Sequence, residues 1–99
     1  MITIKWSKDA IREFDSVLDY WEKRNKSDNY PKRIIKETDN AIKLILSANY
    51  IGIETNLKDV KMRLILNNFY LAYRYKDNTL EILKFWDCRQ NPNTNPFKS

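Results

Sequence analysis

Histidine is absent from this 99-residue sequence, which also contains only one cysteine, one glycine and three prolines. The most common kind of general base is therefore excluded, and acid–base chemistry would need Lys, Arg, Tyr, Asp or Glu. Cys88 has no partner for an internal disulfide, which is typical of the reducing cytoplasm. The shortage of histidine and cysteine also argues against a zinc site. We expect a cytoplasmic protein that holds no metal and no cofactor.

Long apolar runs are missing as well. No segment is long enough to cross a bilayer, and the opening MITIKWSKD lacks the basic-then-apolar layout of a secretory signal. A length of 99 residues with 42% hydrophobic content predicts one globular domain over residues 1–92. Residues 93–99 are predicted to form a polar, flexible tail. The net charge of +5 favours anionic partners such as nucleic acid or an acidic protein.

The first elements can be placed from hydrophobic spacing. Ile2, Ile4 and Trp6 alternate with polar residues, which predicts a short strand. Ser7 is a suitable N-cap for the segment that follows. Apolar residues then recur at helical spacing, so we expect an amphipathic helix that continues to about Arg24.

A second helix is predicted after a short polar connection. Pro31 suits its first turn, and the apolar pattern stops near residues 48–49. The two helices should form an αα-hairpin. The loop that follows contains Gly52, which we expect at a positive φ because glycine adopts that conformation at no steric cost.

Residues 60–92 alternate in the manner of strands. Two-residue turns are predicted at 67–68 and 77–78, because asparagine tolerates positive φ better than most residues. The fold class is therefore α+β, with an N-terminal strand, an αα-hairpin and an antiparallel three-stranded meander. The helices should pack on one face of the sheet, and the first strand should join one of its edges.

Two-residue turns would also set the register of the meander, because side chains alternate with a period of two. On the helix-facing side, counting predicts the pairs Leu66–Phe69, Leu64–Leu71, Met62–Tyr73, Tyr75–Leu80 and Tyr73–Ile82. The other face would then carry Lys61, Arg63, Ile65, Tyr70, Ala72, Arg74, Glu81, Leu83 and Phe85. In this register Arg74 lies between Lys61 on one side and Glu81 on the other.

The outer face predicted in this way is basic and aromatic. Arg63 and Arg74 could make forked contacts to phosphate, and Lys61 could supply a point charge. Tyr70 could stack on a base. The alternative is a solvated sheet face with ordinary surface charges, because antiparallel sheets often leave one side in water. With Arg89 near the end of the sheet, these five residues are the predicted target-binding residues.

The sequence also resembles a known family. The matching features are the opening I-x-W-S-x-x-A at residues 4–10, the helical hairpin, the meander and the ending LEILKFWDCRQNP at residues 80–92. Together they resemble the RelE/ParE superfamily of toxins from bacterial type II toxin–antitoxin modules. The resemblance implies a compact α+β domain with one of two activities. RelE-like members cleave mRNA in the ribosomal A site without a metal, whereas ParE-like members act against DNA gyrase.

The nuclease pattern of this family matches only in part. Lys61 and Arg63 match its alternating cationic pair, and Arg89 matches its arginine after the last strand, so these three would be the catalytic residues of a nuclease. Tyr70 stands where both branches usually carry an arginine, and the tail offers Phe97 in place of a tyrosine. Arginine stays protonated and is a poor general base. Loss of the strand arginine would also remove stabilisation of a phosphate transition state.

These departures favour a ParE-like toxin that binds and poisons DNA gyrase, and enzymatic activity is not expected. A ribosome-dependent mRNA endoribonuclease is the alternative, and a non-toxic nucleic-acid-binding domain is a second one. The resemblance implies a cognate antitoxin of acidic or mixed charge, lying along apolar grooves or a sheet edge. The toxin–antitoxin hetero-oligomer would bind operator DNA through the antitoxin, and no membrane contact is expected.

Overall fold

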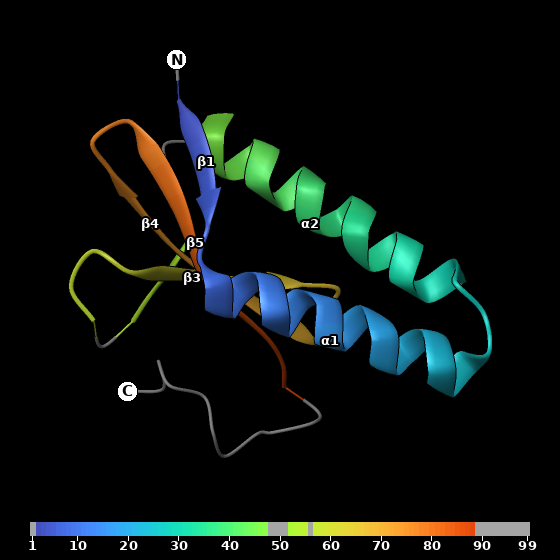
Figure 1. Ribbon diagram of the computed structural model, residues 1–99. Coiled ribbons are helices and arrows are strands. Elements are labelled where there is room, and N and C mark those ends of the chain that lie inside the picture. The colour runs from blue at the N-terminus through green and yellow to red at the C-terminus, as the bar shows by residue number, and fades with distance from the viewer. Residues whose placement is uncertain (1, 48–51, 56, 89–99) are drawn as a thin grey trace.

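Two helices lie over one face of a mixed β-sheet in the computed structural model of the chain (Figure 1). The structure describes residues 2–47, 52–55 and 57–88, so Arg89 and the predicted tail lie outside the described residues. The α+β class predicted from the sequence is confirmed. The elements are β1 (Thr3–Trp6), α1 (Lys8–Asn25), α2 (Asn29–Ser47), β2 (Ile53–Glu54), β3 (Lys61–Ile65), β4 (Phe69–Lys76) and β5 (Thr79–Asp87).

The sheet has the strand order β1-β5-β4-β3-β2. β1 runs parallel to β5, and the other neighbours are antiparallel. The expectation that the first strand joins one edge of the sheet is therefore confirmed. β2 was not predicted, and it pairs through two residues with the start of β3 at the opposite edge. Neither of the two described helices is long and apolar enough to cross a membrane.

Both helices begin as the sequence predicts. Ser7 caps α1, because its Oγ accepts a hydrogen bond of 3.0 Å from the backbone N–H of Ala10. α1 ends where Lys26 adopts a left-handed backbone conformation and donates its N–H to the Glu22 carbonyl. Pro31 lies in the first turn of α2, where its missing N–H leaves no helical hydrogen bond unmade.

The main core lies between the helices and the sheet. Phe69 and Phe85 stack with ring centroids 5.6 Å apart, and Phe14 of α1 packs edge-to-face with Phe85 with centroids 4.8 Å apart. Burying each such ring stabilises the fold by roughly 1.5–3 kcal/mol. The fully or nearly fully buried core side chains are Ala10, Val17, Ile34, Ala41, Ile42, Ile45, Ile65, Phe69, Leu71, Tyr73, Leu80, Ile82 and Phe85.

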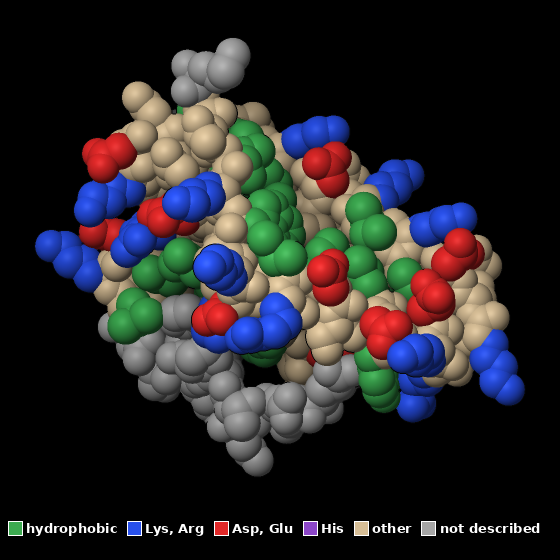
Figure 2. Space-filling model, viewed as in Figure 1, with side chains coloured by type: hydrophobic (Ala, Val, Ile, Leu, Met, Phe, Trp, Pro, Cys, Tyr) green, Lys and Arg blue, Asp and Glu red, His purple; other side chains and the backbone are tan. Residues whose placement is uncertain are grey.

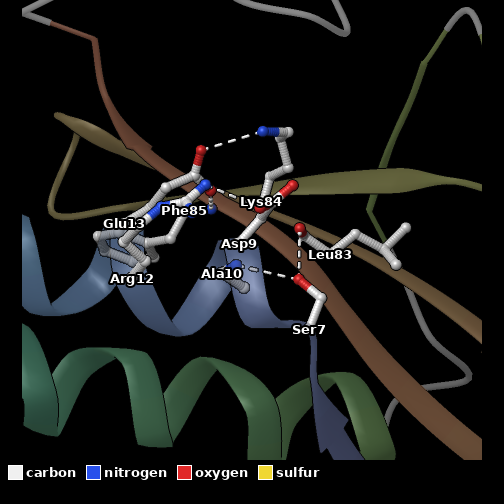
Figure 3. A network of polar contacts seen from close by, with 8 residues as sticks. All are labelled: Ser7, Asp9, Ala10, Arg12, Glu13, Leu83, Lys84 and Phe85. Atoms are coloured by element: carbon white, nitrogen blue, oxygen red, sulfur yellow. Dashed lines mark hydrogen bonds and ion pairs between the residues drawn. The ribbon is translucent and has the colours of Figure 1, made fainter.

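At a bulge in β5, the start of α1 is attached to the last strand of the sheet (Figure 3). β5 has one residue more than β4 between the pairs Ala72–Lys84 and Tyr73–Ile82, so the strand is bulged at Leu83. The Ser7 hydroxyl donates a hydrogen bond of 2.9 Å to the Leu83 carbonyl. The same hydroxyl oxygen caps α1, so one side chain holds both the helix N-terminus and the bulge.

Glu13, one turn into α1, completes this attachment (Figure 3). Its Oε1 accepts a hydrogen bond of 3.2 Å from the backbone N–H of Phe85, and its Oε2 lies 3.0 Å from Lys84 Nζ. Both side chains of the ion pair are mostly buried, so solvent screens it less than a surface pair. β1 pairs with β5 only as far as Ile82, so α1 supplies partners to β5 beyond that point.

The bulge overturns the prediction that Phe85 lies on the outer face. A strictly alternating strand would place Phe85 beside Leu83, but the extra residue shifts the alternation by one position. Phe85 is fully buried against the helices, while Leu83 packs on the outer face as predicted. The predicted pairs Tyr75–Leu80 and Tyr73–Ile82 lie before the bulge and are confirmed.

The register predicted between β3 and β4 was wrong by one residue. The connection has three residues, because Ile65 pairs with Phe69, and the positive φ values fall on Leu66 and Asn67 (53° and 59°) instead of on Asn67 and Asn68. Nothing in the local pattern indicates a positive φ at a leucine, because residues with a Cβ are uncommon there. The turn at Asp77 and Asn78 has the predicted two residues, both at positive φ.

This shift exchanges the two faces of β3. Leu71 and Tyr73 of β4 lie opposite Arg63 and Lys61, where Leu64 and Met62 were expected. Ile65, which was predicted to face outward, is 3% exposed in the main core. Lys61 and Arg63 therefore lie on the helix-facing side, and Met62 and Leu64 lie on the outer side.

We expect Ser7→Ala to lower the free energy of unfolding by about 1–2 kcal/mol, because it removes the helix cap and the hydrogen bond to the Leu83 carbonyl together. Urea unfolding followed by circular dichroism measures the change. Ser16→Ala, at an exposed position of the same helix, is the matched control and should change stability much less. Equal effects of the two substitutions would show that the bulge does not depend on Ser7.

Candidate functional site

The structure divides the predicted basic and aromatic group between two faces of the sheet. Lys61 and Arg63 lie on the helix-facing side of β3, and Tyr70 and Arg74 lie on the outer side of β4. Lys61 is opposite Tyr73, so its predicted position opposite Arg74 was wrong. Arg89 lies outside the described residues.

The two predicted residues on the outer face, Tyr70 and Arg74, contact neighbouring side chains of the sheet. Arg74 lies opposite Glu81, as predicted, and makes two short contacts to its Oε1, at 3.0 Å from Nε and 2.9 Å from Nη2. The ring of Tyr70 packs against Trp86 with centroids 5.3 Å apart. A second apolar cluster surrounds this pair, formed by Val60, Met62, Ala72, Tyr70, Leu83 and Trp86.

On the helix-facing side, Lys61 and Arg63 lie around Tyr73. Lys61 is directly opposite Tyr73, and Arg63 is two residues further along β3 on the same face. Burial raises the pKa of the Tyr73 hydroxyl, and the positive charge of Arg63 opposes that rise only in part. Tyr73 is therefore neutral at physiological pH. Lys61 and Arg63 form no ion pair with another described residue, although Glu54 of β2 lies opposite Lys61.

Gly52 lies against this group, and its φ is not positive, so the prediction from the sequence was wrong. The glycine is explained by lack of space. A Cβ at position 52 would overlap the Tyr73 hydroxyl and would lie 3.0 Å from the Met62 carbonyl oxygen. The close approach of the chain to Tyr73 is therefore possible only without a side chain at this position.

A groove of about 210 Å³ lies between α2 and β3, with Arg63 in its lining. Two leucines of this groove are well exposed, Leu44 on α2 at 45% and Leu64 on β3 at 39%. Glu37 supplies a negative charge on the α2 side, and no ion pair joins it to Arg63. The full lining is Glu37, Asn40, Ala41 and Leu44 from α2, and residues 63–66 from β3 and its turn.

Neither Tyr73 nor Leu44 was predicted from the sequence to be part of a site. Tyr73 was assigned to the core beside Met62, and the one-residue change of register brings it next to Lys61 and Arg63 instead. The positive φ at Leu66 fixes that register, and a leucine is a weak indication of positive φ in a sequence. Among the residues that the structure describes, no group of three or more His, Cys, Asp or Glu could hold a metal ion.

Comparison with known proteins identifies the family. The sequence model for the ParE toxin of the type II toxin–antitoxin system parDE matches residues 4–92. The chain belongs to this toxin family. The resemblance to the RelE/ParE superfamily inferred from the residues is therefore confirmed. No curated protein sequence matches the chain at the level required for a relative.

Solved structures of toxins from this superfamily share the fold. The chain is similar to the chromosomal ParDE toxin–antitoxin system from P. aeruginosa, with a TM-score of 0.73 at 16% identity over 88% of this chain and 96% of that chain. The YoeB dimer from Staphylococcus aureus gives 0.60 at 19% identity, over 84% and 92%. The E. coli DinJ-YafQ toxin-antitoxin complex gives 0.58 at 9% identity, over 90% and 94%. These likenesses establish the fold of the toxin.

We expect Gly52→Ala to destabilise the toxin by roughly 1–3 kcal/mol, because the added methyl group overlaps the Tyr73 hydroxyl. Thermal unfolding of the single variant and of Gly52→Ala combined with Tyr73→Phe measures the effect. Gly52→Ala should lower the stability less when Tyr73 is already phenylalanine than in the parent, because the hydroxyl that the methyl group overlaps is gone. Additive losses would contradict this explanation of the glycine.

Stability should also fall at alkaline pH through Tyr73. Because burial raises the folded-state pKa of Tyr73 above its usual value of 10.0, the unfolded state ionises first. The contribution of the neutral Tyr73 hydroxyl to the free energy of unfolding is present below about pH 10 and is lost as the pH rises from there through the folded-state pKa. Urea midpoints between pH 8 and 11 should decline less steeply in Tyr73→Phe. Tyr20→Phe, at an exposed tyrosine, should keep the slope of the parent, and an unchanged slope in Tyr73→Phe would refute the assignment.

Proposed function

We propose that this toxin inhibits growth by binding DNA gyrase and that a cognate antitoxin neutralises it. The match to the ParE toxin family over residues 4–92 supports a gyrase-directed branch. Similarity to a solved toxin–antitoxin complex supports the antitoxin. Lys61 and Arg63 are the proposed target contacts on the helix-facing side, with Tyr70 and Arg74 on the outer face, and Arg89 remains a prediction.

The observation that carries this proposal is the separation of the cationic residues. Catalysis of phosphoryl transfer needs several groups held around one phosphate. Here Arg74 lies on the opposite face from Lys61 and Arg63 and is already paired with Glu81. Burial raises the pKa of Tyr73 and keeps its hydroxyl neutral, so Tyr73 does not act as a base at neutral pH. Lys61 and Arg63 form no ion pair with another described residue and lie beside an apolar groove, which is better suited to binding an acidic surface.

A ribosome-dependent nuclease is the second candidate. The observation in its favour is that Lys61 and Arg63 lie two residues apart on one face of β3, as the alternating cationic pair of the nuclease pattern requires. Tyr70 packs against Trp86 on the other face, in the position where that pattern has an arginine. The nuclease proposal would therefore depend on Lys61, Arg63 and Arg89 alone.

Purified toxin should inhibit supercoiling of relaxed plasmid by gyrase, and its induction should trigger the DNA-damage response while mRNA stays intact. The double variant Lys61→Ala, Arg63→Ala should need at least about tenfold more protein for half-inhibition, because hydrogen bonds to charged groups contribute about 1.5–3 kcal/mol. The control is Lys32→Ala with Lys43→Ala, which removes two cations of α2 that each pair with an acidic residue four positions earlier.

The same cultures distinguish the alternatives. Codon-position cuts in ribosome-bound mRNA that disappear in Lys61→Ala, together with unaffected supercoiling, would replace the gyrase proposal with the nuclease. Harmless expression combined with steeply salt-dependent binding to DNA or RNA would instead indicate a plain nucleic-acid-binding domain.

A further inference from the structure

A band of apolar side chains lies between the two helices (Figure 2). Ile11 of α1 is 49% exposed and Ile35 of α2 is 48% exposed. Leu18 lies seven positions after Ile11, and Leu46 lies eleven positions after Ile35, so each leucine shares a helical stripe with one of the isoleucines. Both leucines are partly buried against the core. These four residues define the interhelical band. Single exposed apolar residues are ordinary, but a continuous band of them marks an interaction surface.

The interhelical band is separate from the groove between α2 and β3. Leu44 lines that groove, and nine positions separate it from Ile35. Nine positions amount to two and a half helical turns, so the two side chains lie on opposite flanks of α2. On α1, Ile11 lies two positions before Glu13, which contacts β5, and therefore points almost the opposite way. The band thus faces neither β3 nor the attachment of α1 to β5.

The two borders of the interhelical band differ in charge. On α1, Asp15 and Glu22 are seven positions apart on one exposed face, next to Ile11. On α2, Lys36 directly follows Ile35 and is also exposed. None of these three charged residues forms an ion pair with another described residue. The other lysines at the border of α2 each pair with an acidic residue four positions earlier. An acidic border on α1 therefore accompanies a basic border on α2.

A face with one acidic and one basic border is complementary to a second copy of itself. A two-fold axis parallel to the helices places α1 of each copy against α2 of the other, which joins the acidic border to the basic border twice. A two-fold axis across the helices would place α1 against α1 and would join like charges, which repel. Charge therefore favours one symmetric arrangement of two copies.

The positions of the charges along the helices agree with this arrangement. Glu22 and Asp15 lie three and ten residues before the end of α1 at Asn25, and Lys36 lies seven residues after the start of α2 at Asn29. An axis parallel to the helices leaves the distance from the turn unchanged. Lys36 of one copy therefore comes to a level between Glu22 and Asp15 of the other copy.

The face also has the size of a small protein interface. α1 has 18 residues and α2 has 19. Each helix is therefore about 27 Å long, and two helices side by side are about 20 Å wide. Their shared face of roughly 500 Å² is close to the roughly 600 Å² per partner at the lower end of specific interfaces. We expect a dissociation constant in the micromolar range.

We propose that the toxin forms a homodimer through the interhelical band, with α1 of each copy against α2 of the other and Lys36 between the two acidic residues Asp15 and Glu22 of the other copy. No step of this argument depends on the proposed function. The groove lined by Arg63 lies on the other flank of α2, so the dimer leaves this groove open. A dimer therefore carries two copies of that proposed target contact.

Ile35→Arg tests the apolar part of the interface. Sedimentation equilibrium of the purified toxin over a series of micromolar concentrations measures the monomer–dimer dissociation constant. We expect it to rise at least about tenfold, because the buried isoleucine is lost twice in a two-fold interface. The matched control is Leu44→Arg, which adds the same charge at a position 45% exposed on the opposite flank of α2. It should change the dissociation constant less than about twofold.

Charge reversal tests the arrangement of the two copies. One variant combines Asp15→Lys with Glu22→Lys, and the other is Lys36→Glu. Each variant alone should be mainly monomeric at concentrations where the parent is a dimer, because like charges then meet across the interface. An equimolar mixture of the two should form a one-to-one heterodimer, because opposite charges are restored at both contacts. Two variants that stay monomeric in the mixture would overturn the arrangement.

Other outcomes also decide the proposal. A parent toxin that is monomeric at every concentration, or equal losses from Ile35→Arg and Leu44→Arg, would overturn it. A monomer whose inhibition of supercoiling is weakened by Ile35→Arg would overturn it and assign the interhelical band to the target. The sedimentation samples contain no gyrase, so a dimer that fails to inhibit supercoiling would overturn the proposed function alone.

Discussion

The attachment of α1 to the bulged strand β5 is the constraint on which the rest of the structure depends. Ser7 caps the helix and holds the Leu83 carbonyl, and Glu13 binds the next free backbone N–H. Because the contacts of Ser7 and Glu13 with β5 join residues more than 70 positions apart, they hold α1 against the last strand of the sequence. The bulge in turn aims Phe85 into the core, where its ring meets Phe14 and Phe69.

The bulge and the three-residue turn together decide which residues face the helices. Each adds one residue to what regular alternation predicts. A shift of one residue exchanges the two faces of the strand on one side of it relative to the strand on the other side. The turn moves Lys61 and Arg63 toward α2 and sends Met62 outward, into a second apolar cluster with Tyr70 and Trp86. Apolar side chains are thus buried on both faces of β4. Lysine and arginine side chains are spread widely over the surface (Figure 2), and Lys61 and Arg63 lie on the side of the sheet where α2 leaves an open groove.

The proposed target contacts Lys61 and Arg63 lie beside an apolar groove. Because Arg63 lines that groove, a protein that docked there would meet a cation and an apolar surface together. Electrostatic attraction supports fast association, whereas buried apolar contacts govern how slowly a complex dissociates. A partner that combines a carboxylate with an aliphatic side chain would therefore bind more persistently than one that uses charge alone.

The sequence by itself determined the α+β class, the helical hairpin with its Ser7 cap, the pairing of Arg74 with Glu81 and the toxin family, because these depend on local spacing and recognisable motifs. Only the tertiary structure decided the register of β3, the inward position of Phe85 and the reason for Gly52. Leu66 accepts a positive φ because the resulting register buries Ile65, and that gain depends on contacts with distant elements. Alternation along a strand indicates which residues share a face, but packing against the helices determines which of the two faces is buried.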